Sequence, residues 1–589
     1  MRQTRRTLAR PRPRNPPAPS TPPPPGQASS TEAARTAPPD PASAPPLLAP
    51  AASARARSLS APEHPFWRWL LLACALATAL PLWLTKHLPF TDLPQHAAAI
   101  SSLRHWFDPA FRVQEHFTLA LSQTQYLLYY VLGALLAFPF GTAERANLVL
   151  LSLIAIGFPY SLRSLLRALE FDERLALFGV TLFWSQTLLI GFFNYLAAMP
   201  MLLYALALAV RLARAPTRRL QIELGLLSLA LFYMHLSAFL FFAPAAGFAL
   251  LMVDPDAAPA ADVLHANDER NRQSLSNRAI TFLRSKLPGF WWTLPSIAAA
   301  LLFLLKSPVV RPETVGWSQP MNTQFEEIEK ALKDLPDALL NIWQGPQDEW
   351  CLMALLVAAA LLAWPGVREA EPPGLVRRRS LAALWLSWAA LLYFAFPVSI
   401  GWLWQLNERY ALVFALLAPL LLRPARGLRS ALPLLLVAGT GLFAAGNAAG
   451  EFRLFEREVS HFDQVIEQTE PGKHLLSMIF EQNSRVARFS PFLHYGSYYR
   501  ARKGGVASFS FAELPQSPLR YIPGMGPPPK PAGWEWHALD YNNAREGPYY
   551  DYWLVHGYVD PLARLNLATG PKWKLKVRDG EWALYEKVE

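Results

Sequence analysis

Residues 66–96 read FWRWLLLACALATALPLWLTKHLPFTDLPQH, and this stretch decides how the rest of the sequence is interpreted. Its first part, 66–84, is apolar over a length that crosses the hydrocarbon core of a bilayer. Its second part places an ionisable pair, Asp92 and His96, directly after that segment. Ionisable groups are expensive to keep at a bilayer edge and are therefore functional candidates. The structural alternative is that Asp92 only caps the helix predicted to start at Pro94.

The composition predicts a polytopic membrane protein. The chain has 589 residues, 52% of them hydrophobic and 12% aromatic. Apolar runs of about 18 to 20 residues recur from 66 to 446, each long enough to span a bilayer. The fold class we expect is mainly α, a transmembrane helix bundle of about eleven spans with a small soluble α/β domain at its C-terminus. The predicted spans are 66–85, 145–165, 175–192, 195–213, 221–235, 237–252, 288–305, 350–365, 380–398, 409–423 and 431–447.

The net charge of +11 does not predict nucleic-acid binding, because most of it lies in one tail. Residues 1–62 hold nine Arg against two acidic residues, together with sixteen Pro, so we expect a disordered cytoplasmic segment. Segment 66–84 lacks a cleavage site of small residues and is interpreted as a retained anchor. Cys74 and Cys351 both lie in apolar spans, which excludes a disulfide framework and a thiolate metal site built from them.

Basic residues set the predicted topology. If 119–140 is a juxtamembrane or re-entrant hairpin, all the basic turns after it face the cytoplasm, as the positive-inside rule expects. These turns lie near 163–174, 211–219, 270–286, 377–379 and 423–429. The bundle is then 63–449, with external loops at 86–143 and 306–348. The resulting localisation is a bacterial inner membrane, with the C-terminus on the periplasmic or extracellular side.

From about residue 450 the chain becomes richer in charged residues, Gly and Pro. A helix is predicted at 451–469 and strands at 474–480, 549–555, 573–577 and 581–586. We therefore expect 450–589 to form an external soluble α/β domain. Its dense Tyr and Trp residues favour a packed core or a seat on the membrane interface over a surface that stacks on sugars.

Polar side chains from several outer turns are predicted to meet in one cavity that opens away from the cytoplasm. Asp92 is the predicted catalytic base, and Arg409 would bind a phosphate. The residues predicted to bind substrate are His96, Asn194, His235, Glu408, Arg409 and Arg311. Structural alternatives remain open: His235 as a packing residue, Asn194 as the cap or brace of a turn, and Arg409 as an interfacial side chain paired with Glu408.

The sequence predicts no dedicated metal site and no certain cofactor. Asp92, His96 and a bound phosphate would supply ligands to a hard divalent ion, but one carboxylate and one imidazole make a poor site. No phosphate-binding Gly-rich loop and no serine nucleophile elbow occurs in the sequence.

Several short motifs resemble the GT-C superfamily of membrane glycosyltransferases, in particular the bacterial branch near the aminoarabinose and protein O-mannosyl transferases. An acidic residue follows the first span at Thr91-Asp-Leu-Pro94, and an amphipathic external segment ends in Phe-Gly at 135–141. A span opening Ala143-Glu-Arg-Ala-Asn147 closes in basic residues near Arg167, and a late span opens with Arg in Asn407-Glu-Arg-Tyr410. The resemblance covers about 66–450 in layout.

The resemblance implies transfer of a sugar from a polyprenyl-phosphate donor on the non-cytoplasmic face, with Asp92 as base or as the residue that aligns a metal and the acceptor. The expected partners are the lipid bilayer, that donor, and a glycan, lipid or protein acceptor. Many members carry paired acids in the first loop, whereas Asp92 stands alone here. Two other functions are retained as alternatives: a transporter or flippase of lipid-linked material, and a non-catalytic envelope-assembly protein.

Overall fold

A computed structural model describes residues 65–121, 124–254, 286–311, 321–364, 371–425, 428–531 and 533–588. The predicted tail at 1–62 and the arginines of the 270–284 segment lie outside these residues. Contacts between Cα atoms group residues 64–589 as one compact unit, which is the unit described below.

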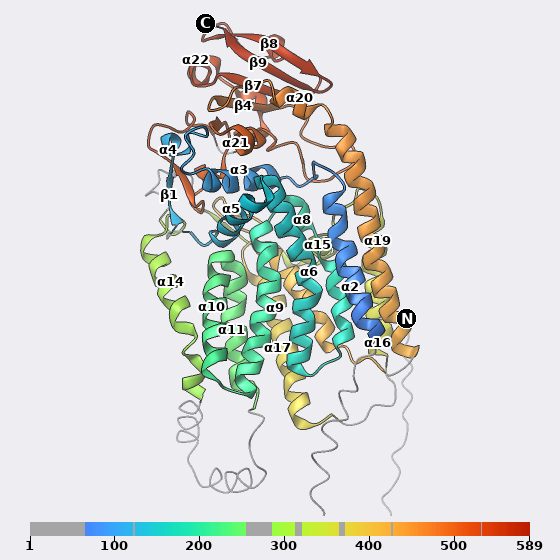
Figure 1. The fold of residues 1–589 in the computed structure, drawn as a ribbon. Coiled ribbons are helices and arrows are strands. Elements are labelled where there is room, and N and C mark those ends of the chain that lie inside the picture. The colour runs from blue at the N-terminus through green and yellow to red at the C-terminus, as the bar shows by residue number, and fades with distance from the viewer. Residues whose placement is uncertain are drawn as a thin grey trace, which may run out of the picture. The chain divides into compact units, whose positions relative to one another are not determined.

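The protein is a multi-pass helical membrane protein (Figure 1). Four helical segments among the described residues are long and apolar enough to cross a membrane: Pro65–Trp83 (α2 with η1), Ala143–Leu169 (α6), Phe193–Arg214 (α9) and Arg429–Val459 within α19 (Leu428–Val459). Shorter apolar helices are α5 (Leu128–Phe140), α11 (Leu236–Met252), α14 (Thr293–Lys306) and Arg409–Leu421 (α18 with η6). The remaining predicted spans, except one, fall on α10 (Arg218–Met234), α16 (Gln347–Ala363) and α17 (Pro373–Ala395).

The exception is the predicted span 175–192, which is not a continuous helix. It is divided into η3 (Glu173–Leu177), α7 (Phe178–Leu182) and α8 (Gln186–Ile190). The chain is extended at Ser185 and adopts φ +101° at Gly191. A run of polar residues interrupts the apolar pattern where the helix breaks, and Gly is the residue that tolerates this backbone conformation. The break brings 189–191 against the start of α3 (Leu93–Arg104).

The bundle is organised around α9. This helix packs against α6, α10 and α11, and most of its residues are buried (Figure 1). Its sequence is apolar on nearly all sides, as expected for a helix with neighbours all round. The indole of Trp385 on α17 donates a hydrogen bond of 2.8 Å to the carbonyl of Ala245 on α11, which links the outer helices to this centre.

Ion pairs gather the basic turns at one end of the bundle. Glu170 pairs with Arg214 and with Arg378, and Glu371 pairs with Arg379 and Arg423. Segments that are far apart in sequence therefore share one end of the bundle, as the charge-based topology predicts.

The C-terminal region contains a five-stranded mixed sheet, in the order β5-β4-β7-β9-β8 among the described strands. Strand β4 (His474–Ile479) runs parallel to β5 (Val506–Ala507) and β7 (Tyr552–His556). Strand β9 (Trp582–Val588) pairs antiparallel with β7 and with β8 (Lys572–Asp579). The predicted strands are confirmed. The predicted helix 451–469 is instead the end of α19 followed by α20 (Phe462–Ile466), so the predicted boundary at 449–450 lies inside a continuous helix.

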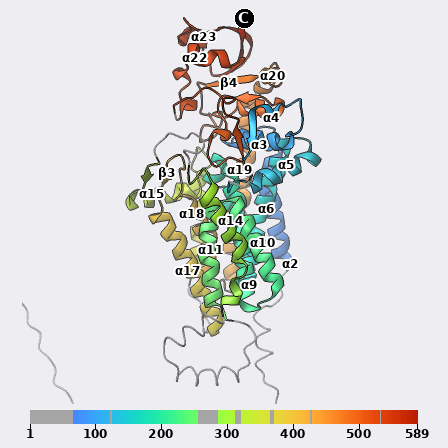
Figure 2. The same ribbon diagram turned by 90° about the vertical axis from the view of Figure 1, so that its left-hand side faces the viewer.

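The external loop after the first span joins the C-terminal region to the bundle. Strand β1 (Phe117–Leu119) pairs antiparallel with β6 (Leu519–Tyr521), and α3 packs against α21 (Ser497–Lys503). On another side, β2 (Thr323–Gln324) pairs with β3 (Ser399–Ile400). Figure 2 shows α15 (Ile328–Leu339) beside α17 and α18, with which it is in contact.

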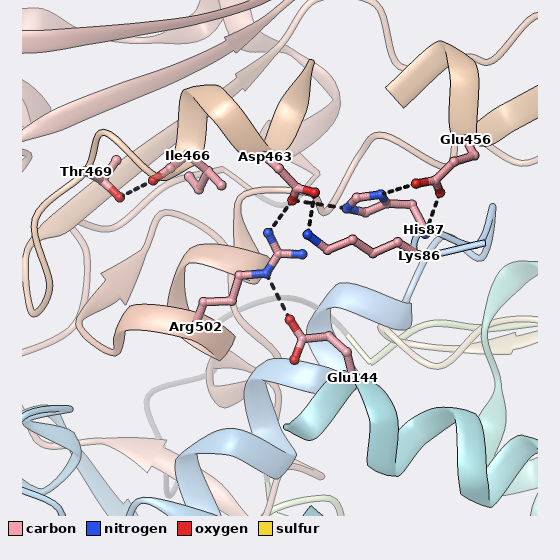
Figure 3. A network of polar contacts seen from close by, with 8 residues as sticks. All are labelled: Lys86, His87, Glu144, Glu456, Asp463, Ile466, Thr469 and Arg502. Atoms are coloured by element: carbon pink, nitrogen blue, oxygen red, sulfur yellow. Dashed lines mark hydrogen bonds and ion pairs between the residues drawn. The ribbon is translucent and has the colours of Figure 1, made fainter. Parts of the chain in front are cut away.

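A polar network ties the first loop to the C-terminal region (Figure 3). Asp463 on α20 accepts from Lys86 at 2.6 Å and from Arg502 at 2.6 Å. His87 lies between two carboxylates, with Nε2 3.3 Å from Asp463 and Nδ1 3.4 Å from Glu456 on α19. Arg502 also donates to Glu144 on α6 at 2.9 Å. The network around Asp463 thus connects five segments: the loop after the first span, α6, α19, α20 and α21.

Removal of the Asp463 charge is predicted to destabilise the protein. Asp463→Asn leaves the buried His87 and the partly buried Arg502 without this charged acceptor, which costs about 2–3 kcal/mol. The matched control is Glu329→Gln, whose exposed pair with Lys333 contributes about 0.5 kcal/mol or less. Thermal unfolding of the two variants in detergent should show a lowered midpoint for Asp463→Asn alone. Equal midpoints would show that the network does not stabilise the fold.

The same network predicts how stability changes with pH. Burial opposes charge on His87, but the carboxylates of Asp463 and Glu456 outweigh it and raise the pKa of His87 above 6.5. Its stabilising contribution is therefore complete below about pH 6.5 and is lost as pH rises through the folded-state pKa. Burial raises the pKa of Asp463, but His87, Arg502 and Lys86 hold it well below 3.8, so its contribution persists above that pH. The unfolding midpoint of the wild type should fall more than that of His87→Gln between about pH 6 and pH 9.

Candidate active site

A cavity of about 140 Å³ lies at the end of the bundle opposite the basic turns. Five of the residues predicted from the sequence line it: Asp92, His96, Asn194, His235 and Arg409. Asp92 precedes α3, Asn194 begins α9, His235 joins α10 to α11, and Arg409 begins α18. Each therefore sits at a helix end. Asp92 is the one carboxylate and Arg409 the one cation of Arg or Lys type among the described lining residues.

The backbone around Asp92 is fixed by the broken segment. The amide N–H of Thr91 donates to Leu189 and that of Asp92 to Ile190, each at 3.1 Å. A Cβ at Gly191 would lie 2.7 Å from the Cβ of Asp92, so only glycine allows this close approach. Asp92 occupies the N-cap position of α3, but its side chain makes no capping hydrogen bond. The capping explanation of this residue is therefore wrong, and the carboxylate is available to the cavity.

His96 is held as a neutral imidazole. Its Nε2 lies 2.8 Å from the carbonyl oxygen of Gly191, which assigns the proton to Nε2. Its ring stacks on Tyr130 with centroids 5.5 Å apart. Burial lowers the pKa of His96 to about 4, despite the nearby carboxylate of Asp92. Nδ1 is buried without a hydrogen-bond partner among the described residues, and it keeps a lone pair.

Arg409 is a buried cation without a carboxylate partner. It is 7% exposed, and its contacts among the described residues are with His235, the carbonyl of Trp404 and the ring of Phe192, not with an acidic side chain. Its Nη2 donates to the carbonyl of Trp404 at 3.2 Å, and the guanidinium lies 4.8 Å from the ring centroid of Phe192. The hydroxyl of Tyr195 donates to its backbone carbonyl. The structural alternative, an interfacial Arg409 paired with Glu408, is therefore not what the described residues show, since Arg409 is buried and contacts His235 and Trp404.

His235 lies beside Arg409 in the cavity. Nη1 of Arg409 is 3.1 Å from Nε2 of His235, and because a guanidinium can only donate, the imidazole is the acceptor of this hydrogen bond. The amide of Ser237 lies 3.2 Å from the other ring nitrogen, Nδ1. Nε of Arg409 is buried without a hydrogen-bond partner among the described residues, and an anionic oxygen would satisfy it.

The other predicted residues lie at the edge of the site or outside it. Asn194 donates from Nδ2 to the carbonyl of Tyr126 at 3.3 Å, so it braces a turn as well as lining the cavity. Glu408 lines a much smaller adjoining pocket with Arg409 and accepts from Gln186 at 3.4 Å. Burial, followed by the neighbouring Glu326, raises the pKa of Glu408 to about 7. Arg311 is not among the described residues that line either cavity.

Part of the cavity wall comes from two segments that the sequence did not indicate, the loop after β3 and the C-terminal region. Trp402 donates from Nε1 to Oε1 of Gln516 at 2.6 Å, which joins these two segments across the cavity. His494 places Nδ1 3.0 Å from Oδ1 of Asp92. These residues belong to no recognisable motif, and their proximity to Asp92 arises only from the tertiary fold. Further lining residues are Tyr126, Tyr130, Tyr195, Trp404, Phe511 and Leu514.

The side chains do not suit a divalent cation. Hard ions such as Mg²⁺ take about six oxygen ligands, and the cavity offers one carboxylate. His96 would add one nitrogen ligand through Nδ1, and imidazole is not a ligand that such hard ions prefer. No cluster of three or more His, Cys, Asp or Glu with metal-binding geometry occurs among the described residues.

Solved structures with a similar fold exist, although the sequence itself matches no known family. No family model and no curated protein matches the sequence. The structure is similar to ArnT from Cupriavidus metallidurans bound to undecaprenyl phosphate, with a TM-score of 0.50 and 11% identity over 89% of this chain and 98% of that chain. The apo state of that protein gives a TM-score of 0.47, with 13% identity over 88% of this chain and 97% of that chain. Arabinofuranosyltransferase AftD from Mycobacteria gives 0.46, with 14% identity over 88% of this chain and 40% of that chain. The first likeness confirms the GT-C-like fold to which the sequence resemblance points.

Gly191→Ala is predicted to disturb the site and the fold around it. The new methyl group would meet Asp92 at a φ of +101°, where a non-glycine residue costs about 1–3 kcal/mol. Gly247→Ala is the control, because a Cβ at that helical position meets nothing within 4 Å. Thermal unfolding in detergent should show a lower midpoint for Gly191→Ala and an unchanged or higher one for Gly247→Ala. If Gly191→Ala is as stable as the wild type, the close approach to Asp92 is not a constraint.

Proposed function

We propose that this protein is a membrane glycosyltransferase that moves a sugar from a polyprenyl-phosphate donor to an envelope acceptor on the non-cytoplasmic face. One observation carries the proposal: a single cavity contains one carboxylate, Asp92, and one buried guanidinium, Arg409, that forms no ion pair with an acidic side chain of the described residues. Such a cation needs a negative partner, because an unpaired charge in a low-dielectric site is destabilising.

The donor phosphate would bind at Arg409, whose guanidinium is held by His235. Nε of Arg409 is buried without a hydrogen-bond partner among the described residues, and phosphate oxygens are strong acceptors for guanidinium. The crystal structure of similar fold from Cupriavidus metallidurans contains undecaprenyl phosphate, which supports a lipid phosphate as the donor class. Charge matching would also stabilise the phosphate as it leaves.

The acceptor would react at Asp92. Its carboxylate takes the proton of an acceptor hydroxyl while the oxygen attacks the anomeric carbon. The bond from that carbon to the phosphate oxygen breaks, and the phosphate keeps the electron pair. One displacement of this kind inverts the anomeric centre. Because the side chains do not suit a divalent cation, the proposed reaction uses positioning and electrostatic stabilisation alone.

Aromatic side chains would hold the sugar between these two groups. Tyr126, Tyr130, Tyr195, Trp402 and Trp404 line the cavity, and flat aromatic faces pack against the apolar face of a sugar ring.

The proposed side of the membrane follows from the arrangement of charge. The cavity residues lie at the helix ends opposite the basic turns, which the positive-inside rule assigns to the cytoplasm. The inner membrane of a bacterium is the proposed location.

Arg409→Gln is predicted to weaken binding of the lipid phosphate. Loss of a charge-assisted contact to phosphate costs about 1.5–3 kcal/mol, or about 10- to 150-fold in Kd. Native mass spectrometry of the full-length protein with undecaprenyl phosphate in detergent measures this binding. The control is Arg219→Gln, which removes an exposed ion pair with Glu223 outside the cavity. Unchanged binding by Arg409→Gln would exclude the proposed phosphate site.

Asp92→Asn is predicted to abolish transfer while retaining lipid-phosphate binding. The amide has nearly the same shape but cannot accept the hydroxyl proton, so the loss should reach about 10²- to 10⁴-fold. Mass spectrometry of envelope glycans and glycolipids from a deletion strain identifies the missing product, and complementation with each variant measures its recovery. Asp108→Asn is the control, because Asp108 pairs with His105 away from the cavity. Full recovery by Asp92→Asn would exclude the proposed base, and an unchanged glycan profile in the deletion strain would favour transport or assembly.

A further inference from the structure

We infer that His494, from the C-terminal region, is a positioning residue for Asp92: its imidazole holds one carboxylate oxygen and leaves the other for the acceptor. The inference rests on the proposed function, because it assigns a role within the same transfer site. His494 does not line the cavity among the described residues, so it acts through Asp92 and not on the substrate.

The contact between the two side chains is close and shielded. Nδ1 of His494 lies 3.0 Å from Oδ1 of Asp92, and the two side chains are 8% and 14% exposed. Nδ1 makes no hydrogen bond of regular geometry, either to Asp92 or to another described residue, so the contact with Oδ1 is a close approach. A small rotation of either side chain would align an N–H at Nδ1 with Oδ1.

The position of His494 is fixed independently of Asp92. Its ring stacks on Phe509, with centroids 5.0 Å apart and planes 20° apart, and it meets the edge of Phe511. Its backbone carbonyl accepts a hydrogen bond of 2.9 Å from Ser497 at the start of α21. The imidazole thus approaches Asp92 from a packed site.

The two segments that carry the pair are also joined to each other. Gln95 donates from Nε2 to the carbonyl of Phe509 and accepts from the amide of Phe511, each at 3.2 Å. Thr91 donates from its hydroxyl to the carbonyl of Phe489. These bonds lie on both sides of Asp92 in sequence and hold the C-terminal region in register with the start of α3.

Other polar groups surround the pair but do not replace His494. His96 and Tyr130 face Asp92 from α3 and α5, and both interact with it electrostatically. Arg409 and His235 line the same cavity from α18 and the α10–α11 turn. Among the described residues, only His494 comes within ion-pair distance of the carboxylate.

The chemistry explains why such a partner is needed. A carboxylate without a second acid or a cation beside it can rotate, and its reactive oxygen is then poorly placed for proton transfer. An N–H on Oδ1 fixes the plane of the group and directs Oδ2 to the acceptor. The acceptor proton goes to Asp92, the new bond forms at the anomeric carbon, and the bond to phosphate breaks with its electrons. No proton passes to His494.

Two substitutions separate this role from simple packing. His494→Asn keeps a side-chain N–H near the position of Nδ1. His494→Phe keeps the ring that stacks on Phe509 but removes the N–H. His461→Phe is the matched control, because His461 is a half-exposed histidine of the C-terminal region that pairs with Asp579 outside the cavity.

The full-length variants are compared by product recovery in the deletion strain, by undecaprenyl phosphate binding in native mass spectrometry, and by thermal unfolding in detergent. Loss of a group that orients a functional ligand reduces activity by about 10- to 100-fold, and this is the loss expected for His494→Phe. Its lipid-phosphate binding and unfolding midpoint should remain those of the wild type. His494→Asn should recover part of the lost transfer, and His461→Phe all of it.

Each contrary result has a separate meaning. Normal transfer by His494→Phe, together with loss in Asp92→Asn, would overturn the positioning role and leave the proposed function intact. Equal losses in His494→Asn and His494→Phe, or a loss that follows the unfolding midpoint, would reduce His494 to a packing residue. Normal transfer by Asp92→Asn would instead overturn the proposed function itself.

Discussion

The site depends on one electrostatic constraint, a guanidinium buried at the mouth of a helix bundle with no described carboxylate within ion-pair distance. Placing Arg409 there is unfavourable unless something else compensates, because a charge loses its hydration in a low-dielectric site. The carbonyl of Trp404 and the ring of Phe192 offset part of that penalty. An anionic ligand bound at Arg409 would offset the rest of this desolvation penalty, because it would neutralise the charge of the guanidinium.

The fold was predictable where the sequence pattern is long and regular. Apolar runs of membrane-spanning length predicted the helices of the bundle. The basic residues predicted which turns lie together at one end of it. The convergence of Asp92, Asn194, His235 and Arg409 followed from topology alone, since all four were assigned to outer helix ends. The prediction of one span at 175–192 was wrong because an average over the segment does not register the polar residues 185–187, next to which the helix is interrupted.

The rest of the site could not be predicted from local sequence. Arg311 was selected for its charge and its outer loop, but no pattern reports whether a loop residue reaches a cavity. His494 belongs to no motif in the sequence, and its contact with Asp92 exists only after the chain has folded back on itself.

Helix α19 has a consequence for how large molecules reach the cavity. It runs unbroken from Leu428 to Val459, and so joins the bundle to the C-terminal region through a rigid rod of about 48 Å instead of a flexible linker. In addition, β1 pairs with β6 and α3 packs against α21 of the C-terminal region. The described residues therefore show no hinge about which this region could move away from Asp92. A large acceptor would then reach the cavity only with a narrow terminal part, which would enter from the side beneath the C-terminal region. This arrangement favours acceptors with slender, extended ends over acceptors with a broad folded surface.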